Sequence, residues 1–170
     1  MNKATCIIVM GVSGSGKTTI GKYIAQKINA VFQDGDNLHP KNNIEKMSNG
    51  IPLDDKDREP WLEKIGKVAM NHLNNSQTII IACSALKRIY RDQLRREIHP
   101  IKFLYLEGTY GQILKQISER KKHFMPASLL KTQFDILEKP STGEHDVTTI
   151  TIGNGEKERI DQKIKSPSFF

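Results

Sequence analysis

The stretch Gly11-Val12-Ser13-Gly14-Ser15-Gly16-Lys17-Thr18 decides the fold. It matches the pattern G-x-x-x-x-G-K-[ST] and lies between an apolar run that ends at Met10 and an amphipathic helix pattern that begins at Lys17. Glycines let the backbone N–H groups of such a loop point inward at phosphate oxygens, and the following helix adds its positive end. A glycine-rich turn that merely caps a helix is the weaker interpretation, because the motif is complete and stands in its proper setting.

The chemistry of this loop predicts ATP and Mg²⁺ as ligands. Lys17 is expected to reach the β- and γ-phosphates, and the Thr18 hydroxyl is expected to bind Mg²⁺. Motors, GTPases, helicases and metabolite kinases share the loop, so it does not define a function by itself. The expected nucleotide contacts are Gly11, Val12, Ser13, Gly14, Ser15, Gly16, Lys17 and Thr18.

Short β-rich runs alternate with helix patterns along the chain, which predicts an α/β fold: a parallel sheet with helices on both faces. The 170 residues suit a single domain over residues 1–170. The predicted strands are Ala4 to Met10, Ala30 to Asp34, Thr78 to Cys83, Lys102 to Leu106 and Val147 to Ile152. The predicted helices are Lys17 to Ile28, Trp61 to Leu73, Tyr90 to Glu97, Tyr110 to Lys121, Ala127 to Leu137 and Lys157 to Ile164.

Composition is that of a soluble globular protein, with 37% hydrophobic and 26% charged residues. The longest apolar run, Cys6 to Val12, is too short to span a membrane, and the N-terminus lacks the pattern of a secretory signal, so we expect a cytoplasmic protein without a membrane partner. Cys6 and Cys83 lie in strand-like runs and are expected to be buried, inert thiols. The tail 166–170 is expected either to fray or to pack on another surface.

The net charge of +7 and the pI of about 9.4 suit either nucleic acid or a small anionic substrate. Aromatic residues make up 6% of the chain, and no stacking platform or nucleic-acid module is recognisable. We therefore expect no nucleic-acid partner and favour the small anion.

Two carboxylates, Asp34 and Asp36, follow the second strand and are spaced to point the same way. Ligands gather at the carboxyl ends of parallel strands, so this pair is expected to face the phosphates. We assign Asp34 to the metal and Asp36 to the acceptor hydroxyl as its base. The alternative is a simple Asp-Gly-Asp turn. The third strand ends in Ala82-Cys83-Ser84 and lacks the terminal aspartate of the usual Walker B strand, which holds Mg²⁺. The missing aspartate makes Asp34 more important as a metal ligand.

An ordered series of motifs spans nearly the whole chain. The motifs are Met10 to Thr18, Asp34-Gly35-Asp36-Asn37-Leu38-His39-Pro40, Asn43 to Met47, Pro52 to Asp55, Asp57-Arg58, Pro60-Trp61-Leu62, Cys83 to Lys87, Tyr90-Arg91-Asp92, Arg120-Lys121, His123-Phe124 and Thr132-Gln133-Phe134. Together they resemble one family, the gluconokinases. The resemblance implies ATP-dependent phosphorylation of D-gluconate at its 6-hydroxyl, on a nucleoside-monophosphate-kinase-like fold with sheet order 2-3-1-4-5 and a short helical lid. It also implies homodimers.

Gluconate carries a carboxylate and a row of hydroxyls, so its site needs a cation and hydrogen-bonding groups. Arg58 is expected to hold the carboxylate, although a surface ion pair with Asp54 or Asp55 is the alternative. His39 and Lys46 are expected to contact hydroxyls, or His39 fixes the turn at Pro40 instead. Trp61 begins an apolar stripe and is expected in the core.

Further cations follow the third predicted strand and the fourth predicted helix, Tyr110 to Lys121. Lys87 and Arg91 are predicted substrate contacts, with Lys87 ranked first. A basic lid over about residues 120–137 is expected to close over ATP, with Arg120 as a catalytic and nucleotide contact and His123 as a substrate contact. The alternatives are a solvated basic turn, or an Arg120 that stacks on adenine. Lys17, Asp36 and Arg120 are thus the expected catalytic residues. The nearest rival function is a shikimate kinase on the same fold.

Overall fold

The computed structural model describes residues 3–120 and 127–169 of the chain. Five parallel strands form one sheet in the order β2-β3-β1-β4-β5, as predicted. The register places Ile7 opposite both Ile80 and Lys102, so β1 is the central strand. The strands are β1 (Cys6–Met10), β2 (Val31–Asp34), β3 (Ile79–Ala82), β4 (Ile101–Glu107) and β5 (Val147–Thr151).

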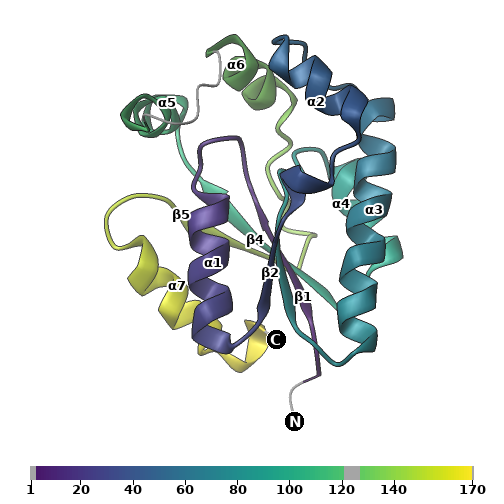
Figure 1. Ribbon diagram of the computed structural model, residues 1–170. Helices are drawn as coiled ribbons and strands as arrows, with labels where there is room; N and C mark the ends of the chain where they lie inside the picture. The colour runs from purple at the N-terminus through teal and green to yellow at the C-terminus, as the bar shows by residue number, and fades with distance from the viewer. Residues whose placement is uncertain (1–2, 121–126, 170) are drawn as a thin grey trace.

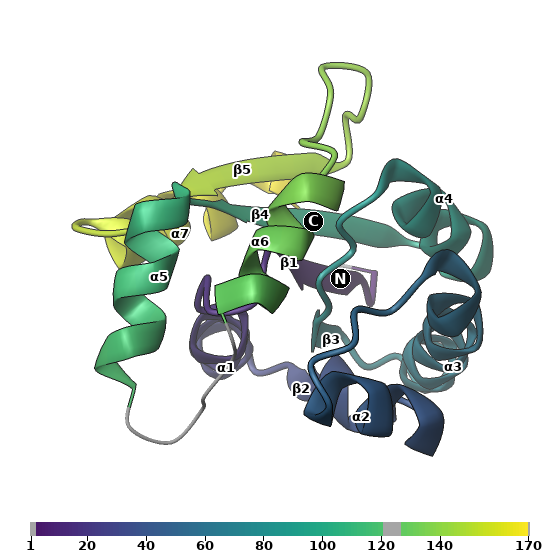
Figure 2. The same cartoon turned by 90° about the horizontal axis from the view of Figure 1, so that it is seen from above.

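Helices cover both faces of this sheet, which gives the predicted three-layer α/β fold (Figure 1). Seen from above, the helices of the two faces lie on opposite sides of the sheet, and α6 lies near its carboxyl end (Figure 2). The helices are α1 (Lys17–Ile28), α2 (Lys41–Ser48), α3 (Asp55–Asn74), α4 (Arg88–Glu97), α5 (Tyr110–Glu119), α6 (Ala127–Ile136) and α7 (Glu156–Ile164), with single 3₁₀ turns at η1 (Gly35–Leu38) and η2 (Pro167–Phe169).

Alternate residues of β1 supply the two halves of the core. Ile7 and Val9 pack in the cluster formed with α1, α5, α6 and α7, whereas Ile8 and Met10 pack in the cluster formed with α3 and α4. Such a strand is buried on both faces, which is why its sequence is continuously apolar rather than alternating. Packing on both faces therefore fixes the position of β1, and with it the position of the loop that follows β1.

Both cysteines lie in this core, as predicted. Cys6 and Cys83 are fully buried free thiols, and burial raises the pKa of each thiol. A protonated thiol without solvent contact is a poor nucleophile, so both act as small apolar side chains. No helix in residues 3–120 and 127–169 is long and apolar enough to cross a bilayer.

Two helical segments differ from the sequence-based expectation. Helix α2 was not predicted, because its polar sequence carries few apolar residues to mark a stripe. Helix α3 begins at Asp55 rather than at Trp61, although Pro60 lies inside it. A reciprocal capping box explains the earlier start: the Asp57 N–H donates to Asp54 Oδ1 (2.8 Å), and the Asp54 N–H donates to Asp57 Oδ2 (3.0 Å).

The C-terminal tail packs rather than frays over its described part. Residues Pro167–Phe169 form a 3₁₀ turn, and Phe169 is buried in the cluster beneath α7. Of the two expected outcomes for the tail, the packed one therefore holds as far as residue 169.

Candidate active site

The phosphate-binding loop has the conformation that its glycines were expected to allow. Gly14 and Gly16 adopt positive φ angles of 79° and 98°, and α1 begins directly after Gly16. A Cβ on Gly14 would lie 2.5 Å from Ile117 Cγ1, so a larger residue has no room there. The Gly11 N–H donates to the Ser84 carbonyl (3.2 Å), which ties the loop to the end of β3.

Lys17 folds back over this loop. Its ammonium donates to the Val12 carbonyl (2.9 Å), and burial lowers the pKa of the amine while the charge of Asp36 opposes that shift. A cation held in such a position is stabilised by any anion that enters the loop. The geometry therefore suits the β- and γ-phosphates of a nucleotide.

Asp34 is held in place from two sides. The Thr18 hydroxyl donates to its Oδ2 (3.0 Å) and the Asp36 N–H donates to its Oδ1 (3.0 Å). Gly35 separates the two acids at a point where a Cβ would lie 2.3 Å from the Ala82 carbonyl oxygen. Only a residue without a side chain lets β2 and β3 end this close together, so the Asp-Gly-Asp segment is more than a turn.

Thr18 and Asp34 offer two converging oxygen ligands. Within the described ranges, no cluster of three or more His, Cys, Asp or Glu residues could cage a metal. A site with one carboxylate and one hydroxyl fits Mg²⁺, which keeps several waters and takes its remaining ligands from phosphates. The oxygen atoms of Thr18 and Asp34 are thus chemically suited to the Mg²⁺ that the sequence predicted for these two residues.

Asp36 lines a cavity of about 880 Å³, and the same cavity is lined by Lys17, Thr18 and Arg58. Enclosure in this cavity raises the pKa of the Asp36 carboxyl, and Asp34 adds to the rise while Lys17 opposes it. The side chain is nevertheless 75% exposed to the open cavity, so water screens these effects. Asp36 and Lys17 therefore face the same space, as the sequence predicted.

Arg58 lies in the wall of this cavity with 7% of its surface exposed. Its guanidinium donates to the Leu53 carbonyl and to the Tyr90 hydroxyl (3.4 Å), and it packs over the Tyr90 ring. None of the ion pairs found among the described residues includes Arg58, so the surface-pair alternative is not what the structure shows. A buried cation without a carboxylate partner marks a place for an anion.

His39 stacks on Trp61 beside Asp36. The ring centroids are 4.0 Å apart with an interplanar angle of 16°, and the indole N–H of Trp61 donates to the Gly35 carbonyl (2.8 Å). Trp61 is almost fully buried, as expected of a core residue. Burial and the nearby charge of Arg58 lower the pKa of His39 to about 4, so the imidazole is neutral at physiological pH.

Three predicted substrate contacts do not lie in the cavity wall. Lys46 pairs with Asp57 (2.8 Å), and Lys87 pairs with Asp55 (2.8 Å). Arg91 is fully buried beneath the loop that follows β3.

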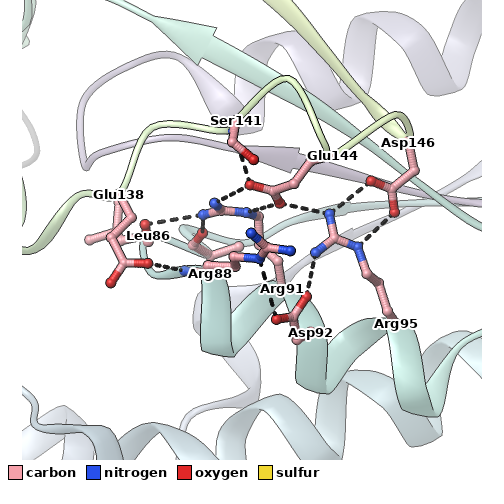
Figure 3. Close-up of polar contacts among 10 residues, drawn as sticks. Leu86, Arg88, Arg91, Asp92, Arg95, Glu138, Ser141, Glu144 and Asp146 are labelled. Atoms are coloured by element: carbon pink, nitrogen blue, oxygen red, sulfur yellow. Dashed lines mark hydrogen bonds and ion pairs between the residues drawn. The ribbon is translucent and has the colours of Figure 1, made fainter.

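Arg91 belongs to a network of ion pairs that ties α4 to the segment before β5 (Figure 3). Its guanidinium donates to both oxygens of Glu144 (2.7 and 2.8 Å) and to the carbonyls of Ala85 and Leu86 (3.0 and 3.2 Å). Arg95 adds bonds to Glu144 and to Asp146. The predicted substrate contact at Arg91 is therefore corrected to a structural role.

Comparisons with known proteins decide between the kinases that share this geometry. A family model described as shikimate kinase matches residues 13–166. The thermosensitive gluconokinase of Escherichia coli (strain K12) is 49% identical over 147 residues, which cover 86% of this chain and 79% of that protein. The thermoresistant gluconokinase of the same organism is 43% identical, over 85% of this chain and 83% of its own length. The chain belongs to the gluconokinase family.

A solved structure supports the same family. The crystal structure of a gluconokinase from Sinorhizobium meliloti 1021 is 41% identical, aligns with a TM-score of 0.83, and covers 95% of this chain and 90% of its own. The shikimate kinase description of the family model and the gluconokinase relatives thus agree on a small-metabolite kinase, and the relatives give the finer membership.

The segment predicted to form a lid, about residues 120–137, is described in part. Arg120 follows α5 and lines the main cavity, whereas His123 lies outside the described residues. Gln133 of α6 accepts a hydrogen bond from the Ser13 N–H (2.6 Å), which brings α6 against the phosphate-binding loop. Gln133 was not predicted as a site residue, although it stands in one of the motifs that carry the resemblance.

Sequence reasoning also missed a second hollow of about 380 Å³ beside the loop. It is lined by Gly16 and Arg120 on one side and by Gly153 and Gly155 on the other. The glycine pair that follows β5 was the available signal, because it marks a turn at the carboxyl end of a strand.

Proposed function

We propose that this protein transfers the γ-phosphoryl group of ATP to D-gluconate and so forms 6-phospho-D-gluconate. The observation that carries the proposal is the buried guanidinium of Arg58, which lacks a carboxylate partner among the described residues and faces the cavity that holds Lys17 and Asp36. A sugar acid supplies the missing carboxylate and, at its other end, a hydroxyl for phosphoryl transfer.

The loop amides and Lys17 would hold the β- and γ-phosphates, and Thr18 and Asp34 would hold Mg²⁺. The bound Mg²⁺ would offset the charge that develops on the phosphate oxygens. Because Asp34 is already fixed by Thr18 and by the Asp36 N–H, little reorganisation is needed when the nucleotide arrives.

Asp36 would accept a hydrogen bond from the 6-hydroxyl and orient it in line with the γ-phosphorus. Arg58 would fix the opposite end of the substrate through its carboxylate. Two fixed ends make the reaction effectively unimolecular, so positioning supplies much of the rate enhancement.

The adenine ring would occupy the second hollow. Arg120 lies between the two cavities, so its guanidinium could stack on the base while its charge stays close to the phosphates. The homodimer implied by the family resemblance, the cytoplasmic location and the absence of nucleic-acid or membrane partners stay predictions.

A substrate profile tests this function. Initial rates of ADP formation would be measured with gluconate, shikimate, other sugar acids and nucleoside monophosphates. We expect gluconate to give by far the highest kcat/KM. A higher kcat/KM for shikimate would favour the rival that the family model's description suggests, and folded protein without gluconate turnover would overturn the proposal.

A further inference from the structure

Asn43, on the buried side of α2, contacts the His39 ring although no role was assigned to it. Its amide nitrogen lies 2.8 Å from the Asp57 carbonyl oxygen and 3.2 Å from His39 Nδ1, and the residue is 2% exposed. A carbonyl oxygen can only accept a hydrogen bond, so the NH₂ group of the amide must face Asp57. Its second N–H is then directed at His39.

This contact fixes the tautomer of His39. Since the Asn43 amide donates, Nδ1 must accept and cannot carry a proton, which leaves the ring proton on Nε2. Stacking on Trp61 fixes the plane of the ring. The charged groups that face the ring are Asp36 from η1 and Arg58 from α3, and burial together with Arg58 disfavours the imidazolium.

The fixed N–H is directed into the cavity near the proposed base. His39 Nε2 lies 4.0 Å from Asp36 Oδ1, which is too long for a direct hydrogen bond but short enough for one oxygen atom to bridge. We propose that Asn43 is a positioning residue, which locks His39 as an Nε2–H donor so that His39 and Asp36 together hold the hydroxyl that receives the phosphoryl group. The identity of that hydroxyl rests on the proposed function.

The arrangement leaves the hydroxyl oxygen ready for attack. It donates its proton to Asp36 and accepts from His39 with one lone pair, so the other lone pair is free to face phosphorus. As the new O–P bond forms, the proton passes to the Asp36 carboxylate, and the electrons of the breaking bond leave with ADP. An Nδ1–H tautomer of His39 would present a second acceptor at Nε2 and lose this orientation.

The tautomer can be measured without any substrate. Long-range ¹H–¹⁵N spectra of the ¹⁵N-labelled full chain, with His39 assigned by comparison with His39→Gln, should show an unprotonated Nδ1 and a protonated Nε2 near pH 7. A protonated Nδ1 would overturn the proposal. This result does not depend on gluconate turnover, so it is distinguishable from a failure of the proposed function.

Asn43→Asp then tests the consequence for the reaction. A carboxylate at position 43 accepts from Nδ1–H and reverses the tautomer, so kcat/KM for gluconate should fall about 10²-fold while KM for ATP is unchanged. Asn75→Asp is the matched control, because the Asn75 amide also donates to a backbone carbonyl (Asn71, 2.8 Å) but lies outside the cavity. If both variants keep the wild-type tautomer and kinetics, Asn43 has no positioning role.

Discussion

At the scale of single residues, Arg58 makes the most specific prediction. Its described hydrogen-bond partners are all neutral, so truncation removes a cation that pairs directly with no carboxylate among the described residues. Loss of one partner of a desolvated charge pair costs 2–5 kcal/mol, and each 1.4 kcal/mol is tenfold. Arg58→Ala should therefore raise KM for gluconate by about 10²-fold in steady-state assays and leave KM for ATP unchanged.

Arg88→Ala is the matched control for this variant. Arg88 lies on the neighbouring helix α4 with 56% of its side chain exposed, and the ion pair that its side chain makes among the described residues is a long contact to Asp92 (3.7 Å). It should leave both KM values unchanged. An equal rise in KM for ATP and for gluconate in Arg58→Ala would refute the placement of the carboxylate at Arg58.

His39 makes a prediction about acid stability. Its pKa is lowered from 6.5 to about 4 in the folded chain, so the unfolded chain binds more protons between these values and stability falls as the pH falls through this window. The loss reaches about 3 kcal/mol, because each pKa unit is worth 1.36 kcal/mol. Urea unfolding of His39→Gln at pH 6.5 and 4.5 should show a smaller loss than wild type, whereas parallel losses would contradict the burial of a neutral imidazole.

The sequence predicted which side chains of the loop and of the Asp34–Asp36 pair would converge, because carboxyl ends of parallel strands meet at one edge. The structure does not bring Lys46, Lys87 and Arg91 to the wall of the main cavity. Each of these cations is neutralised by an acid that folding brings next to it, and Glu144 is 53 residues from Arg91 in the chain. Charge density along a sequence does not show which charges the fold has already paired.

At the scale of elements, the ion pairs in Figure 3 join α4 to the segment before β5. Glu144 is 2% exposed, and its bonds to Arg91 and Arg95 hold the pKa of its carboxyl at about 2. Removal of one partner of a buried pair destabilises by about 3–5 kcal/mol. Glu144→Gln should thus lower the melting temperature by about 10 °C, at about 2–4 °C per kcal/mol for a chain of this size.

Glu63→Gln is the matched control for this element, because Glu63 forms an exposed pair with Lys67 on α3 (2.9 Å) and should leave the melting temperature nearly unchanged. Equal melting temperatures for the two variants would show that the network does not hold α4. Stability contributed by Glu144 is present above the ordinary glutamate pKa of 4.5 and is lost as the pH falls toward 2.

Elements with strong apolar periodicity were predicted within a few residues, including all five strands. Helix α2 and the first turn of α3 were not predicted, because polar and capping residues rather than an apolar stripe mark where these segments begin. The capping box of α3 lies ahead of the apolar stripe that begins at Trp61, so hydrophobic periodicity placed the start of this helix too late. Capping and tertiary burial of Arg58 outweigh the cost of a proline in the second turn.

At the scale of the whole molecule, the sheet order places the loop after β1 beside the ends of β2 and β3. Because of this order, Lys17 and Asp36 line the same cavity. Residues of α2, α3 and α6 complete the walls of that cavity. The proposed function needs all three parts: a phosphate cradle, a base, and a buried cation for the carboxylate.

A crystal structure with Mg²⁺, a non-hydrolysable ATP analogue and gluconate measures this arrangement most directly. The account predicts the gluconate carboxylate against Arg58, and the 6-hydroxyl between Asp36 and the γ-phosphorus, with Lys17 at the phosphates. Gluconate bound with its carboxylate beside Lys17, or outside the cavity altogether, would contradict it.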